Sequence, residues 1–256
     1  MSVTSDRIRY ISPAAPVSMG DDWYGIASLN HFWVRRRFEV LRRLADETMR
    51  RASAVAEVGC GHGLLQRQIE DYYGRDVTGF DLNELALHQT SSRTSAVCCY
   101  DLFQKSPEFE GYFDLLLLFD VLEHLQDEDE FVKAIQFHLA PQGRILVNVP
   151  ALQPLWSKYD EAVGHFRRYN IKTLCQVAHR NGMTISEWSY WGAPLTPLLA
   201  LRKLWLSARR SEKVISTGMD PGNPVMNRLL LWLSRCEHIP QHLVGSSLMA
   251  VFETRP

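Results

Sequence analysis

The chain has 256 residues, of which 46% are hydrophobic and 22% charged, an ordinary globular balance that allows one large domain. Its formal net charge of −1 excludes a general attraction for polyanions, so a nucleic-acid partner would need a local basic patch. Five cysteines without a Cys-x-x-Cys spacing favour reduced thiols in a cytoplasmic protein over disulfides or a zinc site. Residues 1–20 lack the apolar stretch of a signal peptide, and no apolar run is long enough to span a membrane.

The N-terminal part of the chain divides into an arm and a helix. Residues 1–22 are polar and contain prolines, which predicts an irregular arm. From Asn30 to Arg51, apolar residues recur at helical spacing with arginines between them. This pattern predicts an amphipathic helix that leads into the main domain.

Beyond this helix, short apolar strands alternate with helices. The predicted strands are residues 54–58, 76–80, 96–100, 113–119, 144–149, 183–188 and 246–253. The predicted helices are residues 63–73, 84–91, 129–139 and 171–180. Such alternation implies helical crossovers between parallel strands, and hence an α/β fold with a doubly wound, mostly parallel, seven-stranded sheet.

The alternation breaks before the last strand. Residues 191–245 are too long for a simple connection and contain helical stretches at about 195–210 and 224–236, with a turn at 218–224. We therefore predict three parts. These are an N-terminal arm (1–29), a main domain (30–190 with 246–256) and a helical cap or insertion (191–245).

A glycine loop, Gly59-Cys60-Gly61-His62-Gly63, follows the first predicted strand. Open α/β sheets bind ligands at the carboxyl ends of their strands, and glycines there let the backbone approach a ligand closely. A dinucleotide loop has the spacing Gly-x-Gly-x-x-Gly, but Leu64 occupies the third glycine position here. Glu57, just before the loop, suits a cationic amine better than a phosphate.

These features resemble the class I S-adenosylmethionine-dependent methyltransferases, whose first motif is an acidic residue followed by Gly-x-Gly-x-Gly. Asp81 ends the second strand, where the family holds the ribose hydroxyls, and Asp101 ends the third, facing the adenine amino group. The run Asp120-Val121-Leu122-Glu123-His124 after the fourth strand resembles the Asp-Val-Leu-Glu-His segment of a bacterial subgroup. The likeness spans roughly residues 25–190.

The resemblance implies S-adenosylmethionine as the cofactor, bound by the main domain. The residues that it assigns to the cofactor are Trp33, Arg37, Glu57, Gly59, Cys60, Gly61, Gly63, Asp81, Leu82, Asp101, Leu102, Phe119 and Asp120. Trp33 and Arg37 lie in a segment that looks like the entry helix of the subgroup, and ordinary helix packing is the alternative for both. The side chain of Cys60 is expected to be a bystander within the loop.

Two histidines are candidates for a general base, because histidine exchanges protons near neutral pH. His124 follows the fourth strand, where the methyl group lies in this fold, and His165 follows the fifth. A structural contact is the alternative for each. The expected acceptor-binding residues are Trp156, Arg167, Arg168 and Tyr169, in which the arginines would clamp an anion or instead start a solvated helix. No residues show metal-ligand spacing along the chain, so no metal is expected.

The leading hypothesis for the acceptor is a small molecule or modified metabolite that is methylated at a hydroxyl or carboxylate oxygen. N-methylation and a peptide or lipid-linked acceptor remain open. A nucleic-acid acceptor is disfavoured, because Asp120-Val121-Leu122-Glu123 stands where amino-directed enzymes carry an Asn/Asp-Pro-Pro-aromatic run. A non-catalytic binding module is disfavoured by the retained acidic residues and glycines. The oligomeric state is left open.

Residues 195–236 suggest one further partner. Leu198, Leu201, Leu204 and Trp205 fit an apolar stripe, and basic residues lie beside them. One interpretation is peripheral contact with an anionic membrane. The simpler interpretation is a lid or dimer contact that buries these side chains in protein.

Overall fold

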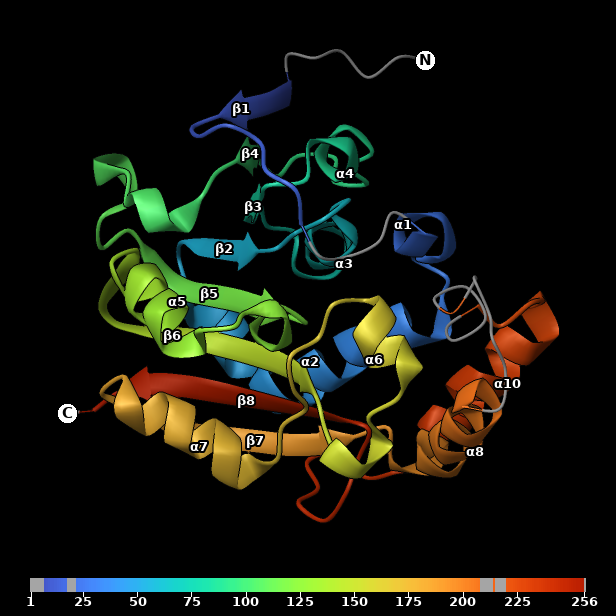
Figure 1. Cartoon of the computed structure of the whole chain (residues 1–256). Coiled ribbons are helices and arrows are strands. Elements are labelled where there is room, and N and C mark those ends of the chain that lie inside the picture. The colour runs from blue at the N-terminus through green and yellow to red at the C-terminus, as the bar shows by residue number, and fades with distance from the viewer. Residues whose placement is uncertain (1–6, 18–21, 208–213, 215–219, 256) are drawn as a thin grey trace.

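An eight-stranded sheet runs through the molecule, with helices on both faces (Figure 1). This computed structural model describes residues 7–17, 22–207, 214 and 220–255. The strands are β1 (Ile8–Tyr10), β2 (Val55–Val58), β3 (Thr78–Asp81), β4 (Val97–Cys99), β5 (Phe113–Phe119), β6 (Leu139–Pro150), β7 (Met183–Trp191) and β8 (Ser247–Thr254). The helices are α1 (Asp22–Ile26), α2 (Phe32–Arg51), α3 (Leu64–Tyr73), α4 (Glu84–His88), α5 (Glu128–Gln136), α6 (Lys158–Ala162), α7 (Ile171–Arg180), α8 (Thr196–Ser207) and α10 (Pro224–Ser234).

The strand order is β1-β4-β3-β2-β5-β6-β8-β7, which confirms a doubly wound, mostly parallel α/β sheet. The neighbours from β1 to β6 pair in parallel, whereas β8 runs antiparallel to both β6 and β7. The chain winds outward from β2 in one direction and from β5 in the other. The carboxyl ends of β2 and β5 therefore flank the crevice where such sheets bind ligands.

The predicted count of seven strands is wrong, and the predicted irregular arm contains regular structure. Residues Ile8–Tyr10 pair with Val97–Cys99 and add β1 to the edge of the sheet. Of the three residues in β1, only Ile8 is buried, so the strand carries no alternating pattern by which to detect it. The short helix α1 starts at the predicted end of the irregular arm and lies within the N-terminal part, residues 1–29.

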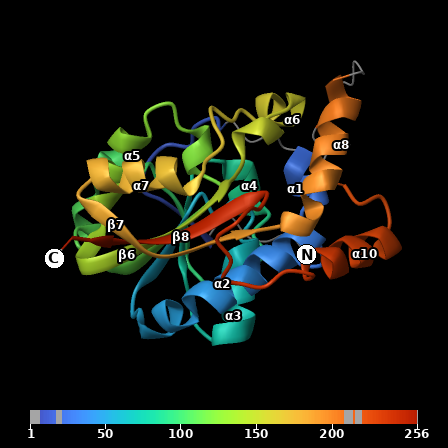
Figure 2. The ribbon, with the colours of Figure 1, turned by 90° about the horizontal axis from the view of Figure 1, so that it is seen from below.

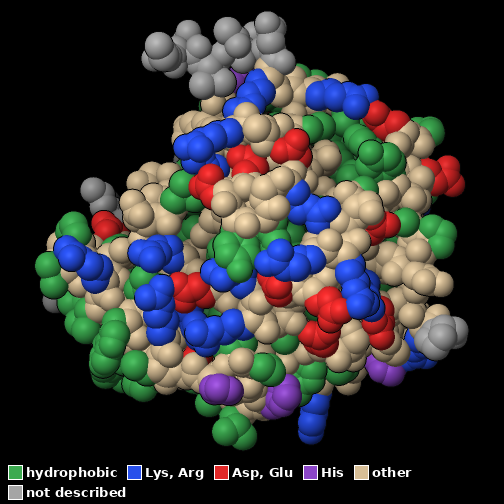
Figure 3. Space-filling view, turned by 180° about the vertical axis from the view of Figure 1, so that it is seen from behind, with side chains coloured by type: hydrophobic (Ala, Val, Ile, Leu, Met, Phe, Trp, Pro, Cys, Tyr) green, Lys and Arg blue, Asp and Glu red, His purple; other side chains and the backbone are tan. Residues whose placement is uncertain are grey.

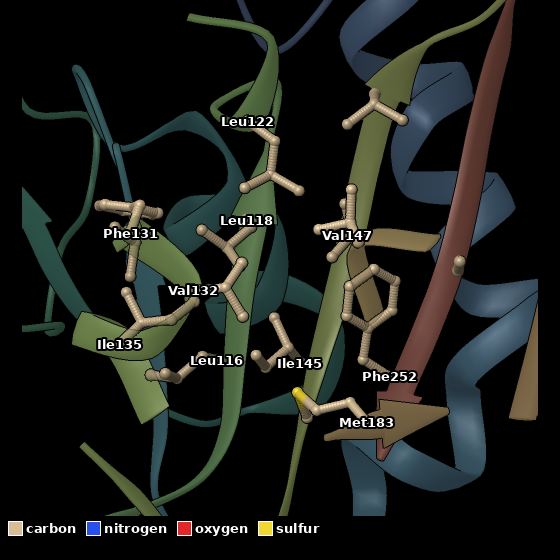
Figure 4. Close-up of a cluster of buried hydrophobic side chains, with 14 of the residues drawn as sticks. Leu116, Leu118, Leu122, Phe131, Val132, Ile135, Ile145, Val147, Met183 and Phe252 are labelled. Atoms are coloured by element: carbon tan, nitrogen blue, oxygen red, sulfur yellow. The ribbon is translucent and has the colours of Figure 1, made fainter. Parts of the chain in front are cut away.

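The middle strand β5 has an unbroken apolar sequence because both of its faces are buried. Leu116 and Leu118 belong to the core beneath α5 and α7, and Leu115 and Leu117 belong to the core beneath α2 and α3 (Figure 2). Figure 4 shows Ile135 of α5 against the first of these two faces. All four leucines are fully buried. Burial of each leucine stabilises the fold by about 1.5–3 kcal/mol. These side chains thereby hold β5 in place, and the carboxyl end of β5 lies at the functional site.

Helices α1, α6, α8 and α10 gather at the carboxyl end of the parallel strands (Figure 1). The side chain of Asn227 docks α10 on the start of α2: it accepts from the N–H of Phe32 at 2.8 Å and donates to the carbonyl of Asn30 at 2.8 Å. None of the described helices has the length and apolar character needed to cross a membrane. Parts of the predicted helix 195–210 and turn 218–224 lie outside the described residues.

Candidate active site

A cavity of about 580 Å³ opens over the carboxyl ends of β2, β3 and β5, a size typical of small-molecule sites. The residues expected at the cofactor line this cavity, with the exception of Gly63. His124 and His165 line it as well. Residues that lie far apart in the sequence therefore line one cavity.

The glycine loop adopts a backbone that other residues rarely take. Gly59, Gly61 and Gly63 have φ angles of +72°, +53° and +70°. A Cβ atom on Gly59 would lie 2.7 Å from Cγ2 of Val121, and one on Gly63 would lie 2.6 Å from Oγ1 of Thr90. The loop thus has room for glycine alone at these two positions. Gly63 caps the start of α3.

Glu57 is a buried carboxyl at the edge of the cavity. It is 3% exposed, and its Oε2 accepts no hydrogen bond from the part of the chain that the structure describes. Burial raises the pKa of Glu57 to about 8, with Asp81 acting in the same direction and Arg37 opposing. A buried carboxylate with an unsatisfied oxygen is costly, so this position fits a ligand that carries a positive charge.

Asp81 and Asp101 occupy neighbouring strand ends. The Asp81 carboxylate accepts the N–H of Gly61 at 2.7 Å and the N–H of Asn83 at 2.8 Å, which braces the glycine loop. Each oxygen retains a second lone pair, so Asp81 can also accept ligand hydroxyls. Asp101 caps the short turn that follows it by accepting the N–H of Phe103 at 3.1 Å.

A polar chain joins α2 to three strand ends. Nη1 of Arg37 lies 2.5 Å from Oδ2 of Asp120, whose Oδ1 accepts from the amide of Asn148 at 2.7 Å. Asn148 in turn accepts from the indole N–H of Trp191 at 2.9 Å, and the Trp191 ring lies 4.4 Å from that of Trp33. Trp33 and Arg37 therefore pack against the sheet and line the cavity at once.

His124 and His165 meet at the other end of the cavity, with ring centroids 4.7 Å apart. Nδ1 of His165 lies 3.0 Å from Oδ1 of Asp160, and Nε2 lies 3.9 Å from Oε1 of Glu123. Burial, aided by the neighbouring His165, lowers the pKa of His124 to about 4, so its imidazole is neutral at pH 7.

Glu123, His124 and His165 also have the donor atoms to hold a metal ion, because these atoms lie within 4.8 Å of one another. His165 is remote from the other two in sequence, so spacing along the chain does not reveal the group. The five cysteines are free thiols, and none of them belongs to this group.

Among the expected acceptor residues, only Arg168 lines the cavity. Its guanidinium binds Asp160 through Nε at 2.8 Å and Nη2 at 3.1 Å, and Nη1 donates to the carbonyl of Ala151 at 3.1 Å. Burial alone would raise the pKa of Asp160, but hydrogen bonds and charge interactions with His165 and Arg168 lower it to about 2. Arg168 therefore stabilises the segment that carries His165.

The structure gives Trp156, Arg167 and Tyr169 contacts away from the cavity. Tyr169 is 2% exposed and donates to Glu128 at 2.5 Å. Arg167 also pairs with Glu128, at 2.8 Å, and Trp156 donates to Glu161 at 3.4 Å. In this structure these side chains brace the surrounding segments.

Aromatic side chains from two short helices line the cavity and were not among the residues expected from the sequence. Tyr24 of α1 lies edge-on to His62, with centroids 5.2 Å apart. Tyr159 of α6 lies beneath the guanidinium of Arg202, 4.6 Å from it. Their sequence signal is a second aromatic residue nearby, because Trp23 precedes Tyr24 and Trp156 lies three residues before Tyr159. Through Arg202 and Leu199, α8 of the insertion also lines the cavity.

The glycine loop at the switch of strand order, the strand-end acids and the antiparallel last strand belong to a Rossmann-like methyltransferase fold, which solved methyltransferase structures share. A family model described as a methyltransferase domain matches residues 30–187. This match covers more than half of the chain, so the chain belongs to the methyltransferase domain family.

Two relatives extend the comparison. A probable S-adenosylmethionine-dependent methyltransferase of Mycolicibacterium smegmatis is 29% identical over 64% of this chain and 63% of that protein. The chloroplastic tocopherol O-methyltransferase of Arabidopsis thaliana is 26% identical over 66% of this chain and 49% of that protein. The chain therefore spans between about half and two thirds of the length of these relatives.

Among solved structures, the [4+2]-cyclase SpnF is similar to the chain, with a TM-score of 0.56. The alignment covers 95% of this chain and 98% of that one, at 16% sequence identity. An identity this low shows a shared fold alone, and the cyclase illustrates that the fold does not determine the reaction.

Proposed function

We propose that the chain is an S-adenosylmethionine-dependent methyltransferase that acts on an oxygen atom of a small molecule or modified metabolite. Glu57 carries the proposal: it is a buried carboxyl with an unsatisfied oxygen among the described residues, beside a glycine loop, in a member of the methyltransferase domain family. A dinucleotide phosphate would be repelled at this position, whereas an ammonium group would be held.

The described residues fit the donor along the strand ends. Glu57 would take its amino group, Asp81 its ribose hydroxyls and Asp101 its adenine amino group. Leu82 and Leu102, which follow these two acids, line the cavity where the adenine would lie. When bound, S-adenosylmethionine supplies a methyl group on a sulfonium sulfur, and its transfer to a hydroxyl breaks the carbon–sulfur bond, forms a carbon–oxygen bond and releases the hydroxyl proton.

The acceptor would lie beside His124 and His165, at the end of the cavity that Tyr159 and Arg202 enclose. The histidine cluster there would activate a hydroxyl, because its proton must leave during transfer. A carboxylate acceptor has no such proton, so its methylation would depend on positioning alone. The likeness to a tocopherol O-methyltransferase supports oxygen as the methylated atom.

Titration calorimetry tests the donor. We expect S-adenosylmethionine to bind and NAD⁺ to fail, and a Gly61→Arg variant to lose donor binding because the new side chain fills the loop. Release of S-adenosylhomocysteine is then measured with panels of hydroxyl, carboxylate and amine acceptors. Failure of the parent protein to bind the donor overturns the proposal, and turnover with amines alone overturns the choice of oxygen.

We also propose that α8 and α10 rest on an anionic membrane surface. Leu201, Leu204 and Trp232 are 62%, 66% and 63% exposed. Neither helix contains an acidic residue, and Lys203 and Arg228 lie among the apolar side chains. Figure 3 shows hydrophobic and basic side chains side by side at this end of the molecule. This combination is typical of helices that lie in a membrane interface.

The position of α8 connects this surface to the cavity. One face of the helix lines the cavity through Leu199 and Arg202, and the opposite side carries exposed Leu201 and Leu204. An amphiphilic acceptor could therefore pass from the membrane along α8 to the histidines. The proposed partner of α8 and α10 is an anionic lipid surface. The test below also detects the alternative, in which a second copy of the chain binds these helices.

A further inference from the structure

Glu123, His124 and His165 place three donor atoms within 4.8 Å of one another at the acceptor end of the cavity. Nε2 of His165 lies 3.9 Å from Oε1 of Glu123. Two metal–ligand bonds of about 2.1 Å span at most about 4.2 Å, so this pair already stands at bridging distance. Because separations of up to 4.8 Å exceed that span, a side chain must shift when all three atoms bind one ion.

Asp160 sets the orientation of the His165 ring. Its carboxylate lies 3.0 Å from Nδ1, so an N–H at that position donates to Asp160 and leaves a lone pair on Nε2, the nitrogen nearest Glu123. A carboxylate behind the ring in this manner is the usual support of a metal-bound histidine. Arg168 holds the same carboxylate through two hydrogen bonds, which makes the support rigid.

Glu123 supplies a buried carboxyl group with one unsatisfied oxygen. It is 1% exposed, and its Oε2 accepts no hydrogen bond from residues 7–17, 22–207, 214 and 220–255. A buried carboxylate in such surroundings is costly unless a cation joins it.

We propose that Glu123, His124 and His165 bind a divalent first-row transition-metal ion. Two imidazoles and one carboxylate suit such ions, whereas Mg²⁺ and Ca²⁺ prefer sites built from oxygen atoms alone. Three protein ligands leave coordination positions open in the cavity. Resting on the proposed function, the ion would polarise an acceptor hydroxyl, so that its proton leaves to solvent more readily. This proposal replaces the sequence expectation that no metal is bound.

Titration of chelator-treated protein with Co²⁺ tests the site in the absence of donor and acceptor. Visible absorption reports coordination by the protein, and calorimetry gives the stoichiometry. We expect one Co²⁺ per chain, displaced by one equivalent of Zn²⁺, with Mg²⁺ unable to compete at the same concentration. A parent protein that binds neither Co²⁺ nor Zn²⁺ overturns the proposal.

Glu123→Gln and His165→Ala test the ligands. Each is expected to weaken Co²⁺ binding at least 10-fold and to change the absorption spectrum. Glu187→Gln and His88→Ala, at exposed positions on β7 and α4, are matched controls that should bind as the parent does. Far-ultraviolet circular dichroism checks that each variant is folded. If one of the two ligand variants unfolds, the Co²⁺ affinity of the other tests the assignment. Equal affinity in a folded ligand variant and the parent overturns the assignment.

The metal site and the proposed function can fail separately. Loss of S-adenosylmethionine binding in the parent overturns the donor site, whatever the Co²⁺ titration shows. Donor binding and turnover in metal-free protein overturn the role of the ion in methyl transfer and leave His165, supported by Asp160, as the group that would accept the proton.

Discussion

Arg37 and Asp120 form an ion pair in which Nη1 and Oδ2 lie 2.5 Å apart, and this pair fastens α2 to the end of β5. The guanidinium also acts on a second carboxyl, because it lowers the pKa of buried Glu57 against the larger effect of burial. One cation thus influences two of the acids that line the cavity, Glu57 and Asp120.

Replacing Arg37 with Met retains much of the apolar stem but removes the charge. The pKa of Glu57 then rises further, so we expect S-adenosylmethionine to bind about 10-fold more weakly at pH 7 for each pKa unit gained. Calorimetry at pH 7 and pH 9 measures the effect, which should shrink at pH 9. Arg35→Met, at an exposed position on the same helix, is the control. A loss that is equal at both pH values contradicts the coupling.

Glu57→Gln should alter the pH dependence of stability. The pKa of Glu57 lies at about 8 in the fold, above its usual 4.5, so its contribution to stability is complete below pH 4.5 and is lost as the pH rises toward 8. The loss is at most about 1.4 kcal/mol per pH unit.

Thermal unfolding of the unliganded protein from pH 5 to pH 8 tests this prediction. We expect the Tm of Glu57→Gln to exceed that of the parent increasingly as pH rises, while donor binding is lost. Glu187→Gln should follow the parent. A constant Tm difference across the range would show that Glu57 does not titrate there.

Gly59→Ala should abolish donor binding, because its Cβ would meet Val121 at 2.7 Å in a backbone with φ of +72°. Gly74→Ala is the matched control: φ is +62°, but no atom lies within 4 Å of the added Cβ. The control should lose about 1–2 kcal/mol of stability and keep its affinity for the donor. Partial recovery in Gly59→Ala/Val121→Ala would locate the clash, and unchanged affinity in Gly59→Ala would refute it.

Vesicle flotation tests the membrane surface. The parent should float with vesicles that contain phosphatidylglycerol, less so at high salt, and Leu204→Glu/Trp232→Glu should remain behind. Leu243→Glu changes a leucine that is 90% exposed and lies outside both helices, so it serves as the control. No flotation of the parent overturns the proposal, and dimerisation that the double variant abolishes would assign the surface to a second copy.

The half of the site that we propose for the donor is predictable from the sequence because its residues stand at or near strand ends. Glu57 is the next-to-last residue of β2, Asp81 ends β3 and Asp101 follows β4, and parallel strands bring these ends to one edge of the sheet. Local pattern and topology together therefore determine their positions.

The acceptor half is not predictable in this way, because it depends on contacts between distant segments. His165 lies near Glu123 only because the fold brings two distant segments of the chain together. Residues 167–169 are extended, so neighbouring side chains point to opposite sides. Arg168 therefore lines the cavity, whereas Arg167 and Tyr169 contact Glu128. The sequence does not say which of the alternating sides faces inward.

The position of β8 has a consequence for synthesis of the chain. β8 comes last in the sequence yet lies between β6 and β7. While a ribosome is still making residues 192–246, β7 has no strand to pair with, and one edge of β6 stays open. The nascent sheet must therefore remain incomplete until the final strand emerges, and a chaperone that shields strand edges would have most to protect during that interval.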